Sequence, residues 1–262
     1  MDLSLQSKLA VVTGSASGIG KATAARFLRE GATVVVNGLF QEEVEAALGQ
    51  LKPLGAVSGC VADLSRRDGA ERLFDFARKL GPVDILVNNV GVFSVQPFVE
   101  ATDEDWLHYF NVNVMSAIRM ARLALPQMLE RNSGAIVNLS SEAAVKPLPQ
   151  MVHYSVTKTA LLGLTRGLAE VTKGTGVRVN SVLPGPTWTE GVAAYFEGLA
   201  RQKGEPMDSI IDNYFRNDEP TSLIQRFVKP EEVADMIAFV STMPAANGGA
   251  YRVEGGIIRS IL

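Results

Sequence analysis

Short apolar runs rich in β-branched residues recur along this chain, separated by stretches with helical patterns. The runs are LAVVT from Leu9, ATVVVN from Ala32, GAVSGCV from Gly55, VDILVNN from Val83, GAIVNLSS from Gly134 and VRVNSVL from Val177. Several are apolar throughout instead of alternating, which is typical of strands covered on both faces. Because parallel strands need helical crossovers, this pattern predicts an α/β fold: a doubly wound parallel sheet of about seven strands with helices on both faces.

Cap and turn residues divide the helical stretches consistently. Thr102 precedes DEDW as a helix N-cap, with Asp105 three residues later. Gly31 ends the first helix and Pro230 opens PEEVADMIAFV. No shift in composition marks a linker, so we expect residues 1–262 to form a single domain with one long excursion at about 186–228.

Charge and cysteine content exclude several classes of protein. The 25 basic and 28 acidic residues are interspersed without a basic tract, so we expect no binding to nucleic acid or to an anionic membrane. Cys60 is the only cysteine, so the chain lacks an intrachain disulfide and the ligands of a zinc finger, and we expect no metal site. With no apolar run of membrane-spanning length and no basic leader, we expect a soluble, unprocessed, cytoplasmic protein.

The first predicted strand runs directly into TGSASGIGK, with an apolar helical pattern behind it. Gly14, Gly18 and Gly20 let the backbone bend and let a pyrophosphate approach the amides at the positive end of that helix. The turn therefore predicts a dinucleotide site, although its spacing differs from the commoner GxGxxG and an ordinary glycine-rich turn is the alternative. The other residues that we assign to the cofactor here are Ser15, Ser17 and Ile19.

Tyr154 and Lys158, in the stretch HYSVTKTALL, are four residues apart. On a helix this spacing puts both side chains on one face, where they can reach a common point. Alone, the pair is more typical of a solvated surface couple than of a reactive site. Its interpretation therefore depends on the rest of the chain.

Six motifs follow one another in the order TGSASGIG, NNVG, NVNV, IVNLSS, YSVTK and VNSVLPGP. In this order they resemble the short-chain dehydrogenase/reductase family over nearly the full length of the chain, which implies a Rossmann-like fold. The catalytic positions of that family match Asn113, Ser141, Tyr154 and Lys158. Family spacing to the tyrosine favours Ser141 over Ser140. The distance from Trp106 favours Asn113 over Asn111.

These residue types suit hydride transfer to a carbonyl, which becomes an alkoxide and needs a proton donor beside it. Tyrosine has an ordinary pKa of about 10, and the ammonium of Lys158 should lower it. Ser141 would polarise the substrate oxygen, and the resemblance gives Lys158 a contact with the nicotinamide ribose and Asn113 a water leading to solvent. We expect an NAD(P)-dependent oxidoreductase that interconverts a secondary alcohol and a ketone, with Tyr154 as general acid/base. The alternative is a catalytically silent nucleotide-binding redox sensor or scaffold.

The resemblance implies further cofactor contacts, one position at a time. Asp63 matches the residue that contacts adenine, and Asn89 matches the residue that supports the central sheet. The loop beside the nicotinamide carboxamide matches Pro184, Gly185 and Thr189. The remaining matched positions are Leu64, Gly91 and Thr187, together with Tyr154 and Lys158. Val90 departs from the usual alanine and narrows the space near the adenosine ribose.

The end of the second strand, VVVNGLF, bears on the choice between NAD and NADP. Gly38 stands where NAD-preferring relatives place an acid, and Leu39 where NADP-preferring relatives often place an arginine. Both of those side chains are absent, so we expect weak discrimination. NADP is slightly favoured, because nothing repels its 2'-phosphate and Asn37 can donate a hydrogen bond to it.

The excursion contains two helix-like stretches broken at KGEP, and we expect it to be a substrate lid. About half of its apolar side chains should pack the lid's own small core. The pocket candidates, which flank the matched catalytic segments, are Phe93, Val145, Leu148, Met151 and Trp188, beside Ser141. They predict an alcohol or carbonyl substrate that is largely apolar, unless Lys146 reaches inward.

Members of the resembled family are usually dimers or tetramers joined through two long helices and the last strand. Those helices would span about 103–130 and 151–173 here, with small residues at Ala160, Gly163 and Gly167 that allow close approach. The apolar end GGIIRSIL would otherwise be exposed. We expect a homotetramer, and packing within one chain is the alternative role for these residues.

Overall fold

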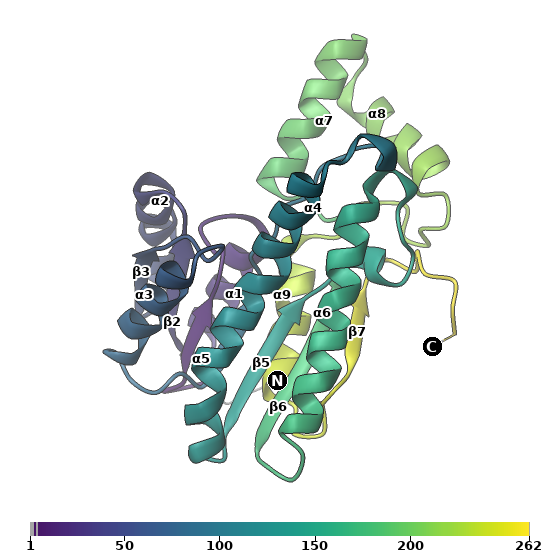
Figure 1. Ribbon diagram of the computed structural model, residues 1–262. Helices are drawn as coiled ribbons and strands as arrows, with labels where there is room; N and C mark the ends of the chain where they lie inside the picture. The colour runs from purple at the N-terminus through teal and green to yellow at the C-terminus, as the bar shows by residue number, and fades with distance from the viewer. Residues whose placement is uncertain (1–2, 4, 262) are drawn as a thin grey trace.

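A parallel β-sheet forms the centre of the computed structural model, which describes residues 3 and 5–261 (Figure 1). Its strands are β1 (Leu9–Val12), β2 (Thr33–Gly38), β3 (Val57–Val61), β4 (Ile85–Asn88), β5 (Gly134–Leu139), β6 (Val177–Pro184) and β7 (Ala250–Val253). They lie in the order β3-β2-β1-β4-β5-β6-β7, and all neighbours are parallel. The predicted doubly wound sheet is confirmed, and the strand order reverses between β1 and β4, where such folds bind ligands.

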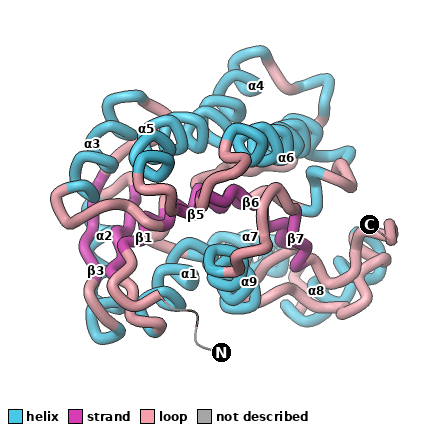
Figure 2. Tube along the Cα trace, turned by 90° about the horizontal axis from the view of Figure 1, so that it is seen from below, coloured by secondary structure: helices cyan, strands magenta, loops and turns pink. Residues whose placement is uncertain are grey.

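Helices connect the strands and cover both faces of the sheet. They are α1 (Gly18–Arg29), α2 (Gln41–Leu51), α3 (Arg67–Arg78), α4 (Asp103–Phe110), α5 (Ser116–Glu130), α6 (Val152–Val171), α7 (Glu190–Lys203), α8 (Met207–Asn213) and α9 (Pro230–Thr242). Helices α3, α5 and α6 lie on one face, and α1 and α9 lie on the other (Figure 2). The sheet is therefore the middle layer of three.

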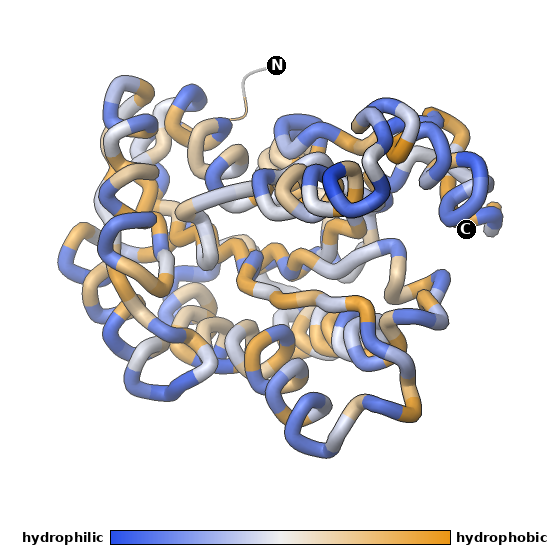
Figure 3. The backbone as a smooth tube through the Cα atoms, turned by 90° about the horizontal axis from the view of Figure 1, so that it is seen from above, coloured by the Kyte–Doolittle hydropathy of each residue, from blue (hydrophilic) through white to orange (hydrophobic). Residues whose placement is uncertain are grey.

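The apolar strands are explained by these two helical layers. Val34 and Val36 of β2 point into the core beneath α1 and α9, while Val35 points into the core beneath α3 and α5. All three are fully buried, and burying a valine side chain contributes about 1.5–3 kcal/mol to stability. Figure 3 shows apolar residues concentrated towards the centre of the molecule and hydrophilic residues on the outer turns.

The predicted cap residues occupy the predicted positions. Thr102 Oγ1 accepts a hydrogen bond from Asp105 N at 3.2 Å, and the Asp105 carboxylate accepts one from Thr102 N at 3.0 Å. Gly31 follows α1 with a φ of 86°, in the left-handed region that favours glycine. Pro230 is the first residue of α9. Local sequence chemistry therefore sets these helix ends.

The excursion (186–228) forms α7, α8 and a π-helical segment η6 (Tyr214–Asp218), and it projects beyond one end of the sheet (Figure 1). Gly204 ends α7 in a left-handed conformation, so the break at KGEP lies where it was predicted. Apolar side chains of the excursion gather in a separate cluster, whose buried members are Phe196, Ile210, Phe215 and Phe227. The excursion thus has its own small core.

The apolar C-terminal stretch packs differently from our expectation. Ile257 and Ile258 are buried within the chain itself, with exposed fractions of 2% and 7%. The buried Glu254 carboxylate fixes this turn, because it accepts hydrogen bonds from the backbone N–H of both isoleucines. Ile261 is exposed, and Leu262 lies outside the described residues. Most of the apolar surface that we expected to need a partner subunit is therefore already covered.

Candidate active site

The glycine-rich turn joins the end of β1 to the start of α1. Gly14 and Gly18 have φ values of 58° and 55°, which glycine adopts without strain. A Cβ on Gly20 would lie 2.5 Å from Gly14 O and 2.6 Å from Asn89 Nδ2. The turn therefore fits a dinucleotide, because only a bare backbone lets a pyrophosphate reach the amides at the N-terminus of α1.

The other residues assigned to this turn support it from within. Ser15 is buried and its Oγ donates to Val12 O at 2.6 Å. Ser17 is the N-cap residue of α1, without a hydrogen bond from its side chain to the helix. Ile19 packs against the core on the α1 side of the sheet. Ser17 is therefore the one of these three residues whose side chain does not stabilise the turn or the core in this way.

Asn89 ties the end of β4 to the same turn. Its Nδ2 donates to Thr13 O and to Gly14 O, each at 2.8 Å. This is the sheet-supporting role that the resemblance implies. Val90 lies beside it, with Cγ2 3.1 Å from the position that a Cβ on Gly14 would take. The larger side chain at residue 90 therefore packs onto the glycine turn.

Asn37 has a different role from the expected one. Its side chain is buried, accepts from Gly14 N at 3.1 Å, and donates through Nδ2 to Cys60 O at 3.2 Å and Ala62 O at 3.0 Å. Both amide hydrogens are therefore used on backbone carbonyls. Asn37 therefore cannot donate the hydrogen bond that we expected it to make to a 2'-phosphate.

A carboxylate missed by the sequence analysis lies beside the end of β2. Glu43 Oε2 is 3.9 Å from the position of a Cβ on Gly38. Leu39, next to it, is 56% exposed and so lies at the surface of this region. The expectation that nothing would repel a 2'-phosphate must therefore be corrected. The acid in the first turn of the following helix was the signal that could have indicated it.

Glu190, the first residue of α7, reaches the glycine turn from the excursion. Its Oε2 accepts from Gly18 N at 2.9 Å, and its Oε1 pairs with Lys21 Nζ at 2.7 Å. Thr189 lies against the same turn, with Cγ2 3.2 Å from the position of a Cβ on Gly18. A carboxylate therefore already occupies the amide that an approaching phosphate would use. No motif in the sequence indicated this contact.

The loop after β6 follows the resemblance in its position. Pro184 ends β6, and a Cβ on Gly185 would lie 2.8 Å from the Glu254 backbone. Thr187 is buried and donates through Oγ1 to Gly185 O at 2.8 Å. Thr187 therefore stabilises the loop itself, and Thr189 is its member nearest to the glycine turn.

The position matched to the adenine contact lies just after β3. Asp63 Oδ1 accepts from Ser65 N at 2.9 Å. Leu64 is buried, and its carbonyl accepts from Arg119 Nη1 at 3.2 Å. The loop that would border an adenine is thus held by its own backbone and by α5.

Tyr154 and Lys158 lie one turn apart on α6, as their spacing predicts. Lys158 Nζ is 5.5 Å from the centroid of the Tyr154 ring and donates to Leu139 O at 3.0 Å. Ser141, which follows β5, lies close enough to the Tyr154 hydroxyl to favour its ionised form. A Cβ on Gly91 would lie 3.2 Å from Lys158 Nζ. The structure therefore brings these sequence-predicted residues to one place at the carboxyl ends of β4 and β5.

Asn113 enters the site from a break in the helix that we expected to be continuous over 103–130. A π-helical segment, η3 (Asn111–Met115), separates α4 from α5. Asn113 Nδ2 donates to Val92 O and to Thr157 Oγ1, each at 3.0 Å, and Oδ1 accepts from Val92 N at 2.7 Å. π-Helical turns are frequent at functional sites. This one fixes Asn113 beside the helix that carries Tyr154 and Lys158.

The hydrogen bonds of Ser140 and Asn111, the alternatives to Ser141 and Asn113, show what these two side chains contact. Ser140 Oγ donates to the Lys158 backbone carbonyl at 2.8 Å. Asn111 Oδ1 accepts from Arg119 Nη2 at 2.7 Å. Both therefore have structural partners away from Tyr154, which agrees with the preference for Ser141 and Asn113.

Burial dominates the acid–base properties of this site. It raises the pKa of Tyr154 above its ordinary value, the charge of Glu142 raises it further, and Ser141 acts in the opposite direction. Burial lowers the pKa of Lys158 to about 8, against the charge of Glu142. The expected lowering of the Tyr154 pKa by Lys158 is not the dominant effect here. Tyr154 holds its proton at neutral pH, as a proton donor must before it reacts.

Glu142, which no sequence motif indicated, lies beside the predicted catalytic residues. It opens the 3₁₀ segment η4 (Glu142–Ala144), and Ser141 Oγ donates to its buried Oε2 at 2.5 Å. Burial raises the pKa of Glu142 to about 7; the Ser141 hydrogen bond lowers it and the charge of Glu219 raises it. An acid beside two serines is typical of an exposed turn, so nothing in the sequence indicated this burial.

Four of the five predicted apolar pocket residues lie near or before α6, and the fifth, Trp188, lies in the excursion. The Phe93 ring meets Tyr154 edge-on at 6.2 Å between centroids, and Met151 is buried near the start of α6. Leu148 is half-buried and Val145 is exposed in the connection before α6. Trp188 instead packs on Phe227 in the core of the excursion, with 4.9 Å between the ring centroids.

Lys146 does reach inward, and it brings a second carboxylate to this region. Its Nζ pairs with Glu219 Oε2 at 2.5 Å, and the Glu219 side chain is 5% exposed. Glu219 follows η6, so this ion pair joins the excursion to the segment after Ser141. The expectation of a largely apolar pocket therefore loses support on this side of the site.

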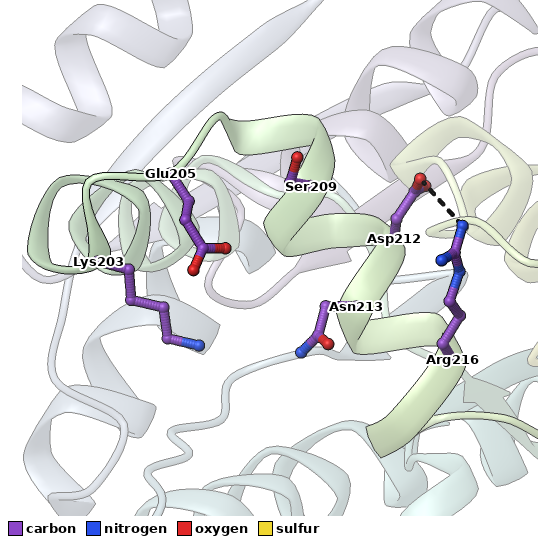
Figure 4. Close-up of a pocket in the computed structure, with 6 residues that line it drawn as sticks. All are labelled: Lys203, Glu205, Ser209, Asp212, Asn213 and Arg216. Carbon is purple, nitrogen blue, oxygen red and sulfur yellow. Dashed lines mark ion pairs between the residues drawn. The ribbon is translucent and has the colours of Figure 1, made fainter.

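Two surface hollows among the described residues lie away from these side chains. Figure 4 shows a polar hollow between the end of α7 and α8, lined by Lys203, Glu205, Ser209, Asp212, Asn213 and Arg216. A shallow apolar hollow lies along α4 and η3, lined by Leu107, His108, Phe110, Asn111 and Met115. Neither is lined by any of the residues predicted to be catalytic.

Within residues 3 and 5–261, no group of three or more histidine, cysteine, aspartate or glutamate side chains could hold a metal ion. No helix in the same part of the chain combines the length and apolarity needed to cross a membrane.

Comparisons with known proteins agree on one family. Residues 8–200 match the family model described as short chain dehydrogenase. The chain is 57% identical to the uncharacterized oxidoreductase YvrD of Bacillus subtilis (strain 168), with 100% of both sequences covered. It is 37% identical to dehydrogenase/reductase SDR family member 4 of Bos taurus, covering 96% of this chain and 88% of that protein. Among solved structures, L-sorbose reductase from Gluconobacter frateurii, complexed with NADPH and L-sorbose, is similar with a TM-score of 0.94, 33% identity and complete coverage of both chains.

Proposed function

The chain belongs to the short-chain dehydrogenase family of oxidoreductases, and from that premise we propose that it interconverts a secondary alcohol and a ketone with NAD(P). One observation carries this proposal: Ser141, Tyr154 and Lys158 converge at the carboxyl ends of β4 and β5. A proton donor, an oxygen-polarising hydroxyl and a cation are what reduction of a carbonyl needs.

Each of these residues has a distinct task in the proposed mechanism. A bound nicotinamide supplies the hydride that reduces the carbonyl carbon. Ser141 orients and polarises the substrate oxygen, and Tyr154 gives its phenolic proton to that oxygen as negative charge develops there. Lys158 donates a hydrogen bond to Leu139 O at 3.0 Å, and its positive charge stabilises the phenolate that Tyr154 becomes when it gives up its proton. Asn113 holds α6 through Thr157 and keeps both residues in position.

For the cofactor, we propose a weak preference for NADP. The similar L-sorbose reductase was solved with NADPH, which supports this choice. The Glu43 carboxylate near Gly38 acts against it, because a negative charge there repels a 2'-phosphate. Gly14, Gly18 and Gly20 would hold the pyrophosphate, and the loop around Thr189 would border the nicotinamide.

For the substrate, we propose a ketone that the excursion covers during the reaction. Phe93 and Met151 offer apolar contacts, whereas Glu142 and the pair Lys146–Glu219 offer polar ones. A ketone with apolar and hydroxyl-bearing groups fits these surroundings better than a wholly apolar one. Closure of α7 and α8 would exclude water from hydride transfer.

We also propose a homotetramer. A Cβ on Gly163 or Gly167 of α6 would meet no atom of the described residues within 4 Å beyond its own stretch of helix, so neither glycine serves close packing within that part of the chain. Leu107 on α4 and Val171 on α6 are 69% and 62% exposed. Two helices with small residues and exposed apolar side chains suit close contact between subunits.

A panel of ketones and secondary alcohols tests the reaction class, with cofactor absorbance as readout. The panel includes ketoses such as L-sorbose as well as apolar ketones, each with NAD(H) and NADP(H). Wild-type protein should turn over at least one member, and Ser141→Ala should lose most of that rate. Ser133→Ala, at the opposite end of β5, is the matched control and should keep it. No turnover of any member by the wild type would reject the proposal.

A further inference from the structure

Glu142 is a buried carboxylate to which the proposed reaction gives no task. Its side chain is 6% exposed, and within the described residues it forms no salt bridge. A buried carboxylate is unfavourable unless it is neutral, paired or hydrogen-bonded. Its side-chain hydrogen-bond partner is Ser141, the hydroxyl proposed to polarise the substrate, and the backbone N–H groups of Glu142 and Ala143 also favour its ionised form. The position therefore requires an explanation in terms of what Ser141 does.

The hydrogen bonds of Ser141 can be counted. A serine hydroxyl has one proton to donate and two lone pairs with which to accept. One lone pair accepts from Ala143 N at 3.1 Å, and the Tyr154 hydroxyl adjoins the same Ser141 oxygen. The oxygen lies 2.5 Å from Glu142 Oε2, and an ionised carboxylate can only accept, so the single proton of Ser141 points at Glu142. In that state Ser141 has no proton to donate to a carbonyl oxygen.

Protonation of Glu142 reverses this hydrogen bond. A carboxylic acid donates its own proton to the second lone pair of Ser141, and the hydroxyl proton of Ser141 becomes free for the substrate. Ser141 then accepts from Ala143 N and from Glu142, and donates to the carbonyl oxygen, so all its hydrogen-bonding capacity is used. Before a substrate binds, the Tyr154 oxygen is the alternative acceptor for this proton.

We infer that Glu142 is a positioning residue that sets the direction of the Ser141 hydrogen bond, and that its protonated form is the one in which Ser141 can polarise a carbonyl. The inference rests on the proposed function of the site. It adds a proton equilibrium, with no change to the hydride and proton that the reaction itself transfers.

The groups around Glu142 make both protonation states accessible near neutral pH. Tyr154 and Lys158 face it from α6, Glu219 and Tyr214 from the excursion, and Lys146 pairs with Glu219. Burial raises the pKa of Glu142 to about 7, the Ser141 hydrogen bond opposes this, and the charge of Glu219 adds to it. Below that pH the acid form dominates, and above it the carboxylate takes the Ser141 proton.

The pH dependence of ketone reduction tests the inference. In wild-type protein, kcat/KM for reduction should fall by up to tenfold for each pH unit above about 7. Glu142→Gln cannot ionise, and its amide always donates to Ser141, so its kcat/KM should keep the low-pH value where the wild type has fallen. A fall that persists in Glu142→Gln would overturn the inference. So would a fall that moves to lower pH, since that result would assign it to Lys158, whose pKa the charge of Glu142 raises.

Glu219→Gln is the matched control. It removes another buried carboxylate of this region, one that pairs with Lys146 instead of Ser141. Loss of its negative charge should lower the pKa of Glu142, so the fall should remain and shift to lower pH. Disappearance of the fall in this variant as well would contradict a role specific to Glu142.

A measurement without turnover separates this inference from the proposed function. The protein is labelled with carbon-13 at glutamate carboxyls, and the Glu142 signal, identified by its absence in Glu142→Gln or Glu142→Asp, is titrated by NMR. Because the Ser141 hydrogen bond favours the ionised carboxylate, Ser141→Ala should raise the Glu142 midpoint. An unchanged midpoint would overturn the inference even if ketones are reduced. A raised midpoint without turnover of any ketone would reject only the proposed function.

Discussion

Replacing Glu190 by glutamine should tighten the binding of NAD(P). The Glu190 carboxylate accepts from Gly18 N at 2.9 Å and pairs with Lys21 Nζ at 2.7 Å, so it holds two groups that would otherwise attract a pyrophosphate. Glutamine keeps an oxygen that can accept from Gly18 N, but it carries no charge, so the substitution removes the repulsion of the pyrophosphate and frees Lys21 from its ion pair. Two unit charges about 4 Å apart interact by about 1 kcal/mol in water and more at a partly buried site. Since the Glu190 side chain is 57% exposed, the value near the water limit applies.

If the binding free energy of the cofactor becomes about 1 kcal/mol more favourable, its dissociation constant falls about fivefold. Titration of the cofactor by calorimetry measures it directly, at low salt and again at high salt, where the gain should shrink. Glu197→Gln removes an exposed acid from the same helix, away from the glycine turn, and should leave the affinity nearly unchanged. Weaker or unchanged binding by Glu190→Gln would show that the carboxylate does not compete with the pyrophosphate.

Three further expectations concern the site and the assembly. Tyr154→Phe should keep the fold and cofactor binding, since the ring and its edge contact with Phe93 remain. It should lose at least about 3 kcal/mol of transition-state stabilisation, which is about 150-fold in kcat/KM. Near-native turnover by this variant would show that Tyr154 is not the proton donor. Leu39→Arg, at an exposed position, should shift preference towards NADP by about 1–3 kcal/mol, and titration of both cofactors with no such gain would mean that the ribose lies elsewhere. Light scattering at micromolar concentration should give the mass of a tetramer, and a monomer would refute the assembly.

Much of the fold could be predicted from local patterns. The strands needed only their apolar runs, because each is covered on both faces, as Val34 and Val35 illustrate by pointing into opposite cores. The helix ends at Gly31 and Thr102 also depend on neighbouring residues alone. The π-helical break around Asn113 could not be predicted in this way, because it is held by tertiary hydrogen bonds to Val92 and Thr157.

The site shows the same division. Tyr154 and Lys158 could be paired from their spacing, since a helix sets their geometry. Glu142 and Glu190 could not be found, because neither stands in a distinctive motif. Glu142 acquires its importance from burial, and Glu190 lies 172 residues from Gly18 in the chain. Asn37 was misread because its amide is occupied by the carbonyls of the neighbouring strand.

The transfer of isotope from cofactor to substrate tests the central proposal most directly. Wild-type protein is incubated with the panel of ketones and with NADPH or NADH carrying deuterium at the transferable position, and products are analysed by mass spectrometry and NMR. Hydride transfer predicts a secondary alcohol that carries deuterium at the former carbonyl carbon, in one stereochemical configuration, with loss of this product in Tyr154→Phe. Failure of every ketone to acquire deuterium from either cofactor would contradict the account.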